Sequence, residues 1–124
     1  MFDHLSIGVR DLASARGFYD AVFAPLGAGL SWSNDRELAY GPGGQRAFWL
    51  YPVTGDQVAG LGAHIAFRAS DRQAVAAAGA AAEAGGATMI RAAGSHPDIA
   101  PDYFGTVFLD PDGNKIEIVA ETMH

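Results

Sequence analysis

The sequence predicts an α+β fold built from two copies of a βαβββ unit, because several features recur at nearly one spacing. His4 and His64 lie in alternating strand patterns 60 residues apart. Asp11 and Asp71, which suit helix N-caps, precede helical patterns at the same spacing. A Gly-Ala pair follows each helical pattern, with a separation of 59 residues. Since self-similarity at a fixed period marks a repeated structural unit, we interpret the chain as an internal duplication.

The length and composition fit a single domain. We assign residues 1–124 to one domain, with module 1 at about 1–53 and module 2 at about 62–121. At this size about two-thirds of the surface of the unfolded chain can be buried. The hydrophobic content of 49% likewise predicts a packed core without disulfides or other covalent links.

Module 1 is predicted to contain a strand, a helix and three further strands. Apolar residues alternate over 3–9, and an apolar stripe at helical spacing follows Asp11 until Pro25 and Gly27 end the helix. The remaining strands are expected at 28–33, 36–41 and 46–52, and a connecting loop at 53–61.

Module 2 is predicted to repeat this order. Apolar residues alternate over 62–69, and an alanine-rich helix runs from Asp71 to about Glu83. A strand is predicted near 87–91, and an irregular segment at 92–102 follows it. The last two strands are expected at 103–109 and 115–119, joined by the turn Asp110-Pro111-Asp112-Gly113-Asn114.

Composition excludes several functional classes. The chain has no cysteine, which excludes disulfides, thiolate metal sites and a cysteine nucleophile. The net charge of −6 and the dispersed basic residues argue against nucleic acid as a partner. The sequence has no apolar run of about 18 residues, which argues against a membrane partner. A cytoplasmic protein that binds a small molecule is therefore expected.

Three residues with metal-ligating side chains occupy repeat-related strands. His4 and His64 lie on the faces opposite the aliphatic side chains of the two opening strands, and Glu117 lies on the last strand. Taken singly, such a histidine is usually a core residue, and such a glutamate usually faces solvent. If the two units pack edge to edge about a pseudo-twofold axis, His4 and His64 approach each other. Glu117 lies beside His64 if their strands pair.

The chain resembles the vicinal oxygen chelate superfamily, which includes glyoxalase I, extradiol dioxygenases, fosfomycin resistance enzymes and bleomycin resistance proteins. The resemblance covers essentially the whole chain and rests on four segments: Phe2-Asp3-His4-Leu5, Asp11-Leu12 with Phe18-Tyr19, 62–67, and 108–118 with its Asp-Pro-Asp-Gly-Asn turn. It implies a curved mixed sheet around a cavity, the glyoxalase/bleomycin resistance/dioxygenase fold. Many single-domain relatives form homodimers, and we expect one here.

The resemblance also implies a metal site formed by His4, His64 and Glu117. A separation of 69 residues between the two Pro-x-Gly turns aligns Glu117 with Phe48, which cannot coordinate a metal. The ligand set therefore lacks the fourth position found in glyoxalase I. Two histidines and a carboxylate suit a divalent ion such as Fe, Mn, Zn or Ni.

Two functions follow as alternatives. One is a divalent-metal-dependent enzyme, of the lyase/isomerase or dioxygenase type, acting on a small substrate with chelating oxygens, including glutathione-linked ones; Glu117 would then be catalytic. The other is a metal-free binding or sequestering protein of the bleomycin-resistance type. Candidate substrate contacts are Phe48, Arg68 and Tyr103, although Arg68 could equally form a structural ion pair and Tyr103 could belong to a solvated loop. The remaining strand aromatics are expected to pack against the sheet or a dimer contact: Trp32, Trp49 and Tyr51.

Overall fold

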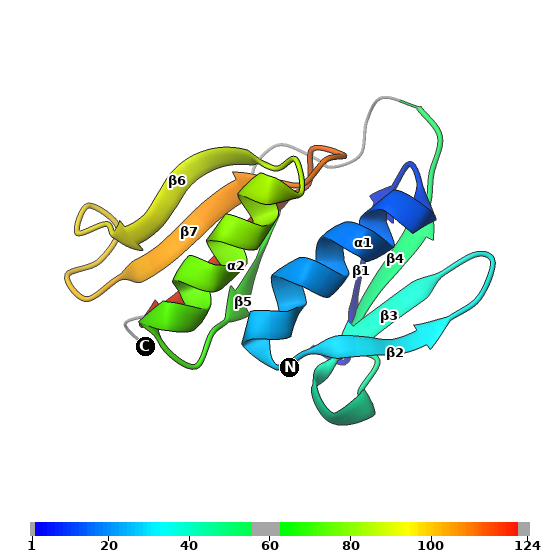
Figure 1. Ribbon diagram of the computed structural model, residues 1–124, viewed down its shortest axis with the longest axis horizontal. Helices are drawn as coiled ribbons and strands as arrows, with labels where there is room; N and C mark the ends of the chain where they lie inside the picture. Colours follow the sequence, from blue (N-terminus) through cyan, green and yellow to red (C-terminus); the bar gives the residue numbers. More distant parts are fainter. Residues whose placement is uncertain (1, 56–62, 122–124) are drawn as a thin grey trace.

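The computed structural model describes residues 2–55 and 63–121, which form two βαβββ units side by side (Figure 1). Module 1 consists of β1 (Leu5–Val9), α1 (Leu12–Phe23), the short 3₁₀ turn η1 (Ala24–Leu26), β2 (Gly29–Ser33), β3 (Leu38–Gly41), η2 (Pro42–Gly44) and β4 (Phe48–Pro52). Module 2 consists of β5 (His64–Arg68), α2 (Arg72–Ala84), β6 (Thr88–Ser95), β7 (Phe104–Leu109) and β8 (Lys115–Glu121). The predicted α+β class and the duplication are confirmed.

The strands form two mixed four-stranded sheets with equivalent topology. Their orders are β1-β4-β3-β2 and β5-β8-β7-β6. The first strand of each module pairs in parallel with the last, and the remaining pairs are antiparallel. The chain's last strand, β8, thus pairs with β5. This is the pairing on which the predicted proximity of Glu117 and His64 depends.

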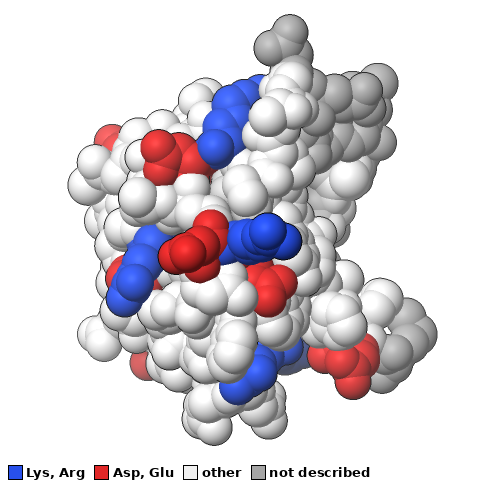
Figure 2. Space-filling view, turned by 90° about the vertical axis from the view of Figure 1, so that its right-hand side faces the viewer, with Lys and Arg blue, Asp and Glu red and all other residues white. Residues whose placement is uncertain are grey.

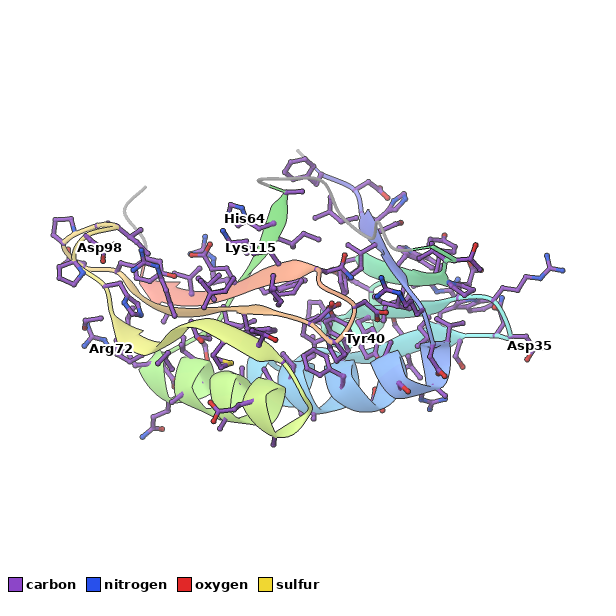
Figure 3. The ribbon with its side chains drawn as sticks, turned by 90° about the horizontal axis from the view of Figure 1, so that it is seen from above. Asp35, Tyr40, His64, Arg72, Asp98 and Lys115 are labelled. Carbon is purple, nitrogen blue, oxygen red and sulfur yellow. The ribbon has the colours of Figure 1, made fainter. Side chains whose placement is uncertain are left out.

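Both helices begin at the predicted caps. The Asp11 side chain accepts a hydrogen bond from the backbone N of Ser14 at 3.0 Å, and Asp71 accepts one from that of Ala74 at 2.8 Å. These bonds satisfy amide donors that have no partner inside the first turn of a helix. The two helices pack against each other and cover the same side of both sheets (Figures 1 and 3). The opposite faces of the two sheets therefore open on one common side.

Aromatic side chains join the two modules in the core. The Phe67 ring of β5 lies 4.9 Å from that of Phe23 in α1 and 5.0 Å from that of Phe48 in β4, measured between ring centroids. Both pairs are edge-to-face, an arrangement that aromatic rings favour. Module 2 therefore packs against module 1 through side chains that all lie on the helix side of the sheets.

The surface is charged without a basic stripe on the side shown. On the face in Figure 2, basic and acidic side chains are interspersed. The ion pairs of the protein include Arg10–Asp112 and Arg16–Asp20. None of the helices in the described residues is both long and apolar enough to cross a membrane.

Candidate functional site

The candidate site lies on the sheet face that the helices leave uncovered. Glu117 of β8 pairs with Ala66 of β5, and the alternation of side chains places Glu117, Ala66 and His64 on one face. His64 Nε2 lies 3.5 Å from Glu117 Oε1. The His64 side chain is 44% exposed and that of Glu117 16%, so the pair can be reached from solvent. The structure thus brings two of the predicted metal ligands together.

Tyr103 contacts the second oxygen of the same carboxylate. Its hydroxyl donates a hydrogen bond of 2.8 Å to Glu117 Oε2, and the residue is only 3% exposed. Burial raises the pKa of Tyr103, and the hydrogen bond and negative charge of Glu117 raise it further. The phenol therefore keeps its proton and acts as a donor. Whether Tyr103 also contacts a substrate stays a prediction.

Sequence reasoning missed the residue that lets Tyr103 reach Glu117. A Cβ atom on Gly105 would lie 2.5 Å from Tyr103 Oη and 2.7 Å from the backbone oxygen of Ile118. The tyrosine ring passes directly over β7 at this glycine. A glycine inside a strand, which often marks close approach, was the available signal.

Gly105→Ala is expected to lower the free energy of unfolding by about 1–3 kcal/mol, the usual range for overpacking. Tyr103 could rotate away from the added methyl group, but the backbone of Ile118 is held in β8. Urea unfolding measures the change. The control is Gly17→Ala on α1, where a Cβ meets nothing within 4 Å. Equal stability of the Gly105 variant and the wild type would contradict the close approach.

The module 1 counterpart of Glu117 is Trp49. Ser6 lies two residues after His4 and pairs with Trp49, just as Ala66 lies two residues after His64 and pairs with Glu117. The predicted counterpart, Phe48, is therefore wrong by one residue. Module 1 has one more residue than module 2 between the glycine of its Pro-x-Gly turn and this position. A slip of one residue moves a side chain to the opposite face of a strand.

Phe48 accordingly belongs to the helix side of the sheet. It pairs with Leu5, is 3% exposed, and lines a pocket of about 160 Å³ with Phe67 and Arg68. This pocket opens at the end of β5 remote from His64 and differs from the Glu117 site. The proposed substrate contacts of Phe48 and Arg68 stay predictions.

Aromatic side chains occupy the uncovered face of sheet β1-β4-β3-β2. Trp49 and Tyr51 stack with ring centroids 6.3 Å apart and an interplanar angle of 14°. Trp32 shares this face, because both Trp32 and Trp49 pair with Ala39 of β3. The Arg46 guanidinium lies 4.2 Å from the Trp32 ring centroid. We call Trp32, Trp49 and Tyr51 the aromatic face; it stands where module 2 carries Glu117.

His4 lies apart from His64 within one chain. His64, at the start of β5, lines a groove with Ser6 and Gly8 of β1. The end of β5 lines a pocket with Ala47, which is hydrogen-bonded to Leu5 at the start of β1. The two opening strands thus run in opposite directions along the boundary between the modules. The expected approach of His4 to His64 is wrong for a single chain. Among the described residues, no group of three His, Asp or Glu side chains could hold a metal ion.

Two of the three predicted ligands nevertheless fit a divalent ion. His64 offers a ring nitrogen and Glu117 a carboxylate oxygen from one face of neighbouring strands, and both are donors that such ions accept. His4 Nδ1 lies within hydrogen-bond distance of Asp3 Oδ1, at 2.7 Å, which suits a histidine whose other ring nitrogen faces a ligand.

Several solved structures share this fold. A glyoxalase/bleomycin resistance protein from Albidiferax ferrireducens T118 is 30% identical, with a TM-score of 0.83 over 98% of this chain and 99% of that one. A glyoxalase/bleomycin resistance protein/dioxygenase family enzyme from Burkholderia phytofirmans PsJN is 20% identical (TM-score 0.72, 95% and 96% coverage). The fosfomycin resistance protein FosX from Listeria monocytogenes, complexed with Mn(II) and sulfate, is also 20% identical (TM-score 0.73, 99% and 91% coverage).

A comparison with curated protein sequences gives no match. Residues 1–118 match a protein family over nearly the whole chain. With the 30% identical relative, this match shows that the chain belongs to the Glyoxalase/Bleomycin resistance protein/Dioxygenase superfamily.

Proposed function

We propose that this chain is a divalent-metal-dependent enzyme whose metal site is shared between two copies in a homodimer. His64 and Glu117 of one copy and His4 of the other would hold the ion. The observation that carries this proposal is the Glu117 carboxylate, which lies between His64 and Tyr103 on an accessible sheet face. A glutamate that merely faced solvent would not need a buried tyrosine as its hydrogen-bond partner.

The arrangement of the modules supports the second copy. Within one chain the uncovered faces of the two sheets open on the same side, away from the helices (Figure 3). A twofold-related copy could set module 1 of one chain opposite module 2 of the other, and symmetry would produce two equal sites. His4, which lies apart from His64 in one chain, could then complete the pair formed by His64 and Glu117.

The donor set favours ions that accept nitrogen and oxygen ligands together. Two imidazoles and one carboxylate suit Fe(II), Mn(II), Zn(II) or Ni(II), and Mn(II) is the first to test because FosX was solved with it. Such an ion, when bound, supplies Lewis-acid polarisation of substrate oxygens. Substrates with two neighbouring oxygens fit this chemistry best.

The residues of the chain divide the remaining tasks. His64 and Glu117 would bind the metal ion, and the Tyr103 hydroxyl donates a hydrogen bond to one oxygen of the Glu117 carboxylate. Because Trp49 stands where a fourth acidic ligand would be, proton transfer at this site falls to Glu117 among the proposed ligands. Arg68 lies at the other end of β5, so it would pair with an anionic group only of a substrate that extends along the strand from Glu117.

Metal binding tests the proposal. Purified protein, freed of metal and reconstituted with Mn(II), is expected to bind the ion in calorimetric titration, and His64→Ala is expected to remove this binding. Asp35→Ala is the control, since Asp35 is an exposed carboxylate far from His64 (Figure 3). Wild-type protein that binds none of the four candidate ions would overturn the proposal.

The aromatic face favours one alternative, a metal-free protein that binds and sequesters a small molecule. The exposed rings of Trp32 and Tyr51, with Trp49 stacked on Tyr51, offer aromatic contact area for an apolar ligand. In that case His4→Ala would leave ligand binding intact, while Trp49→Ala would weaken it. The metal titration separates the two functions.

A further inference from the structure

We infer that Tyr103 is a positioning residue that fixes Glu117 as a ligand offering one oxygen. The inference rests on the proposed metal site and adds a residue that acts through Glu117. The Tyr103 hydroxyl holds Oε2 at 2.8 Å, while Oε1 is the oxygen that faces His64 at 3.5 Å. The two carboxylate oxygens thus have different partners, and only one points toward the imidazole.

Tyr103 is itself held in place from several directions. Its backbone N donates to the oxygen of Ala100 at 3.1 Å, and its backbone oxygen accepts a bond from the N of His96 at 3.3 Å. The ring centroids of His96 and Tyr103 are 5.9 Å apart. His96 is fixed in turn, because its Nε2 lies 2.8 Å from the backbone oxygen of Ala92. A donor anchored in this way can hold a flexible glutamate in a single orientation.

Gly105 makes this hydrogen bond possible. Tyr103 precedes β7, whereas Glu117 lies on the neighbouring β8 and pairs with Val107. The ring must therefore cross β7, and it does so where the strand carries no side chain. A side chain at position 105 would meet the ring carbon Cζ of Tyr103 at 2.7 Å as well as its hydroxyl, so the glycine is needed for the ring to lie there.

The expected consequence is a change in metal affinity. Partners that orient a ligand in proteins typically contribute 10–100-fold to metal binding. Without the hydroxyl, Glu117 would sample other side-chain rotamers, and both of its oxygens would compete for the ion. Loss of the hydroxyl should therefore weaken binding and alter the coordination geometry together.

The chain provides a matched control. Tyr40 is a second buried tyrosine, and its hydroxyl donates a hydrogen bond of the same length, 2.8 Å, to Asp20 on α1. Tyr103→Phe and Tyr40→Phe each remove one hydroxyl and one bond to a carboxylate, and Tyr40→Phe also removes a longer bond of 3.3 Å to the backbone oxygen of Arg16. Only the first removes a partner of Glu117. Thermal unfolding of both variants without metal shows whether their stability falls by similar amounts.

The experiment titrates Mn(II) and Co(II) into the wild type and both variants, and records the visible spectrum of the Co(II) forms. We expect Tyr103→Phe to weaken binding by about 10–100-fold and to shift the Co(II) spectrum. Tyr40→Phe is expected to leave both unchanged.

Three outcomes would overturn the inference. Wild-type affinity and spectrum in Tyr103→Phe would overturn it while leaving the proposed function standing. Equal weakening in both variants would reduce Tyr103 to a structural role. A wild-type protein that binds neither ion would overturn the proposed site and this inference together.

Discussion

Replacing Asp110 by alanine is expected to lower the free energy of unfolding by about 3–5 kcal/mol, as for other buried charged partners. Asp110 is 3% exposed and accepts hydrogen bonds at both oxygens. Oδ1 accepts from the backbone N of Asp112 at 2.9 Å and from that of Asn114 at 2.8 Å. Oδ2 accepts from the Tyr19 hydroxyl at 2.7 Å and from Asn114 Nδ2 at 2.9 Å.

The large expected effect comes from the donors that would remain. Burial and the nearby Asp110 charge raise the pKa of Tyr19, so its hydroxyl stays protonated and would lose its acceptor inside the core. Asn114 also donates to the backbone oxygen of Gly8 at 2.9 Å and so connects the two modules. Loss of Asp110 would thus disturb the turn, the core and the contact between modules at once.

The measurement is chemical unfolding followed by circular dichroism, with Asp98→Ala as the control. Asp98 accepts two hydrogen bonds from Arg91, at 3.1 and 2.8 Å, yet its side chain is 62% exposed. Exposed ion pairs contribute little, so the control should unfold close to the wild type. Similar losses in the two variants would show that burial of Asp110 does not determine its contribution.

Much of the fold was predictable because its signals are local. Asp11 and Asp71 act as helix caps as expected, and each follows a strand and precedes a helix, as the sequence pattern predicts. The strand β6 is longer than predicted and continues to Ser95, whereas the sequence suggested an irregular segment from residue 92. Ala92, Ala93 and Gly94 show no apolar alternation, and irregular pairing with β7 determines the strand there. Tertiary pairing overrides weak local propensity in this segment.

The candidate site was predictable only in part. The adjacency of His64 and Glu117 followed from the repeat, because it needs only that β5 and β8 pair. The module 1 counterpart of Glu117 did not follow from the repeat. The offset between two turns locates a strand position only to within one residue, and an error of one residue moves the side chain to the opposite face of the strand. Trp49 therefore emerged only from the strand register. The separation of His4 from His64 depends on how the modules pack, which no local pattern encodes.

A mixed dimer of one His4→Ala chain and one His64→Ala chain is expected to bind metal, although each variant alone binds it weakly. His4→Ala and His64→Ala should each weaken metal binding by at least about 100-fold. Losing a residue that only orients a ligand costs up to about 100-fold, and these two residues are proposed as ligands themselves. In a twofold dimer with shared sites, a mixed dimer places both substitutions in one site. The other site then keeps His4 from one chain and His64 with Glu117 from the other.

The decisive measurement is the metal content of that mixed dimer, isolated from co-expressed, differently tagged chains and titrated with Mn(II). The shared-site account predicts binding with about wild-type affinity at about half the wild-type stoichiometry, since one of two symmetric sites stays intact. Both variant homodimers, purified in parallel, should bind Mn(II) at least about 100-fold more weakly than the wild type. A mixed dimer that binds no more metal than the two homodimers would contradict the account.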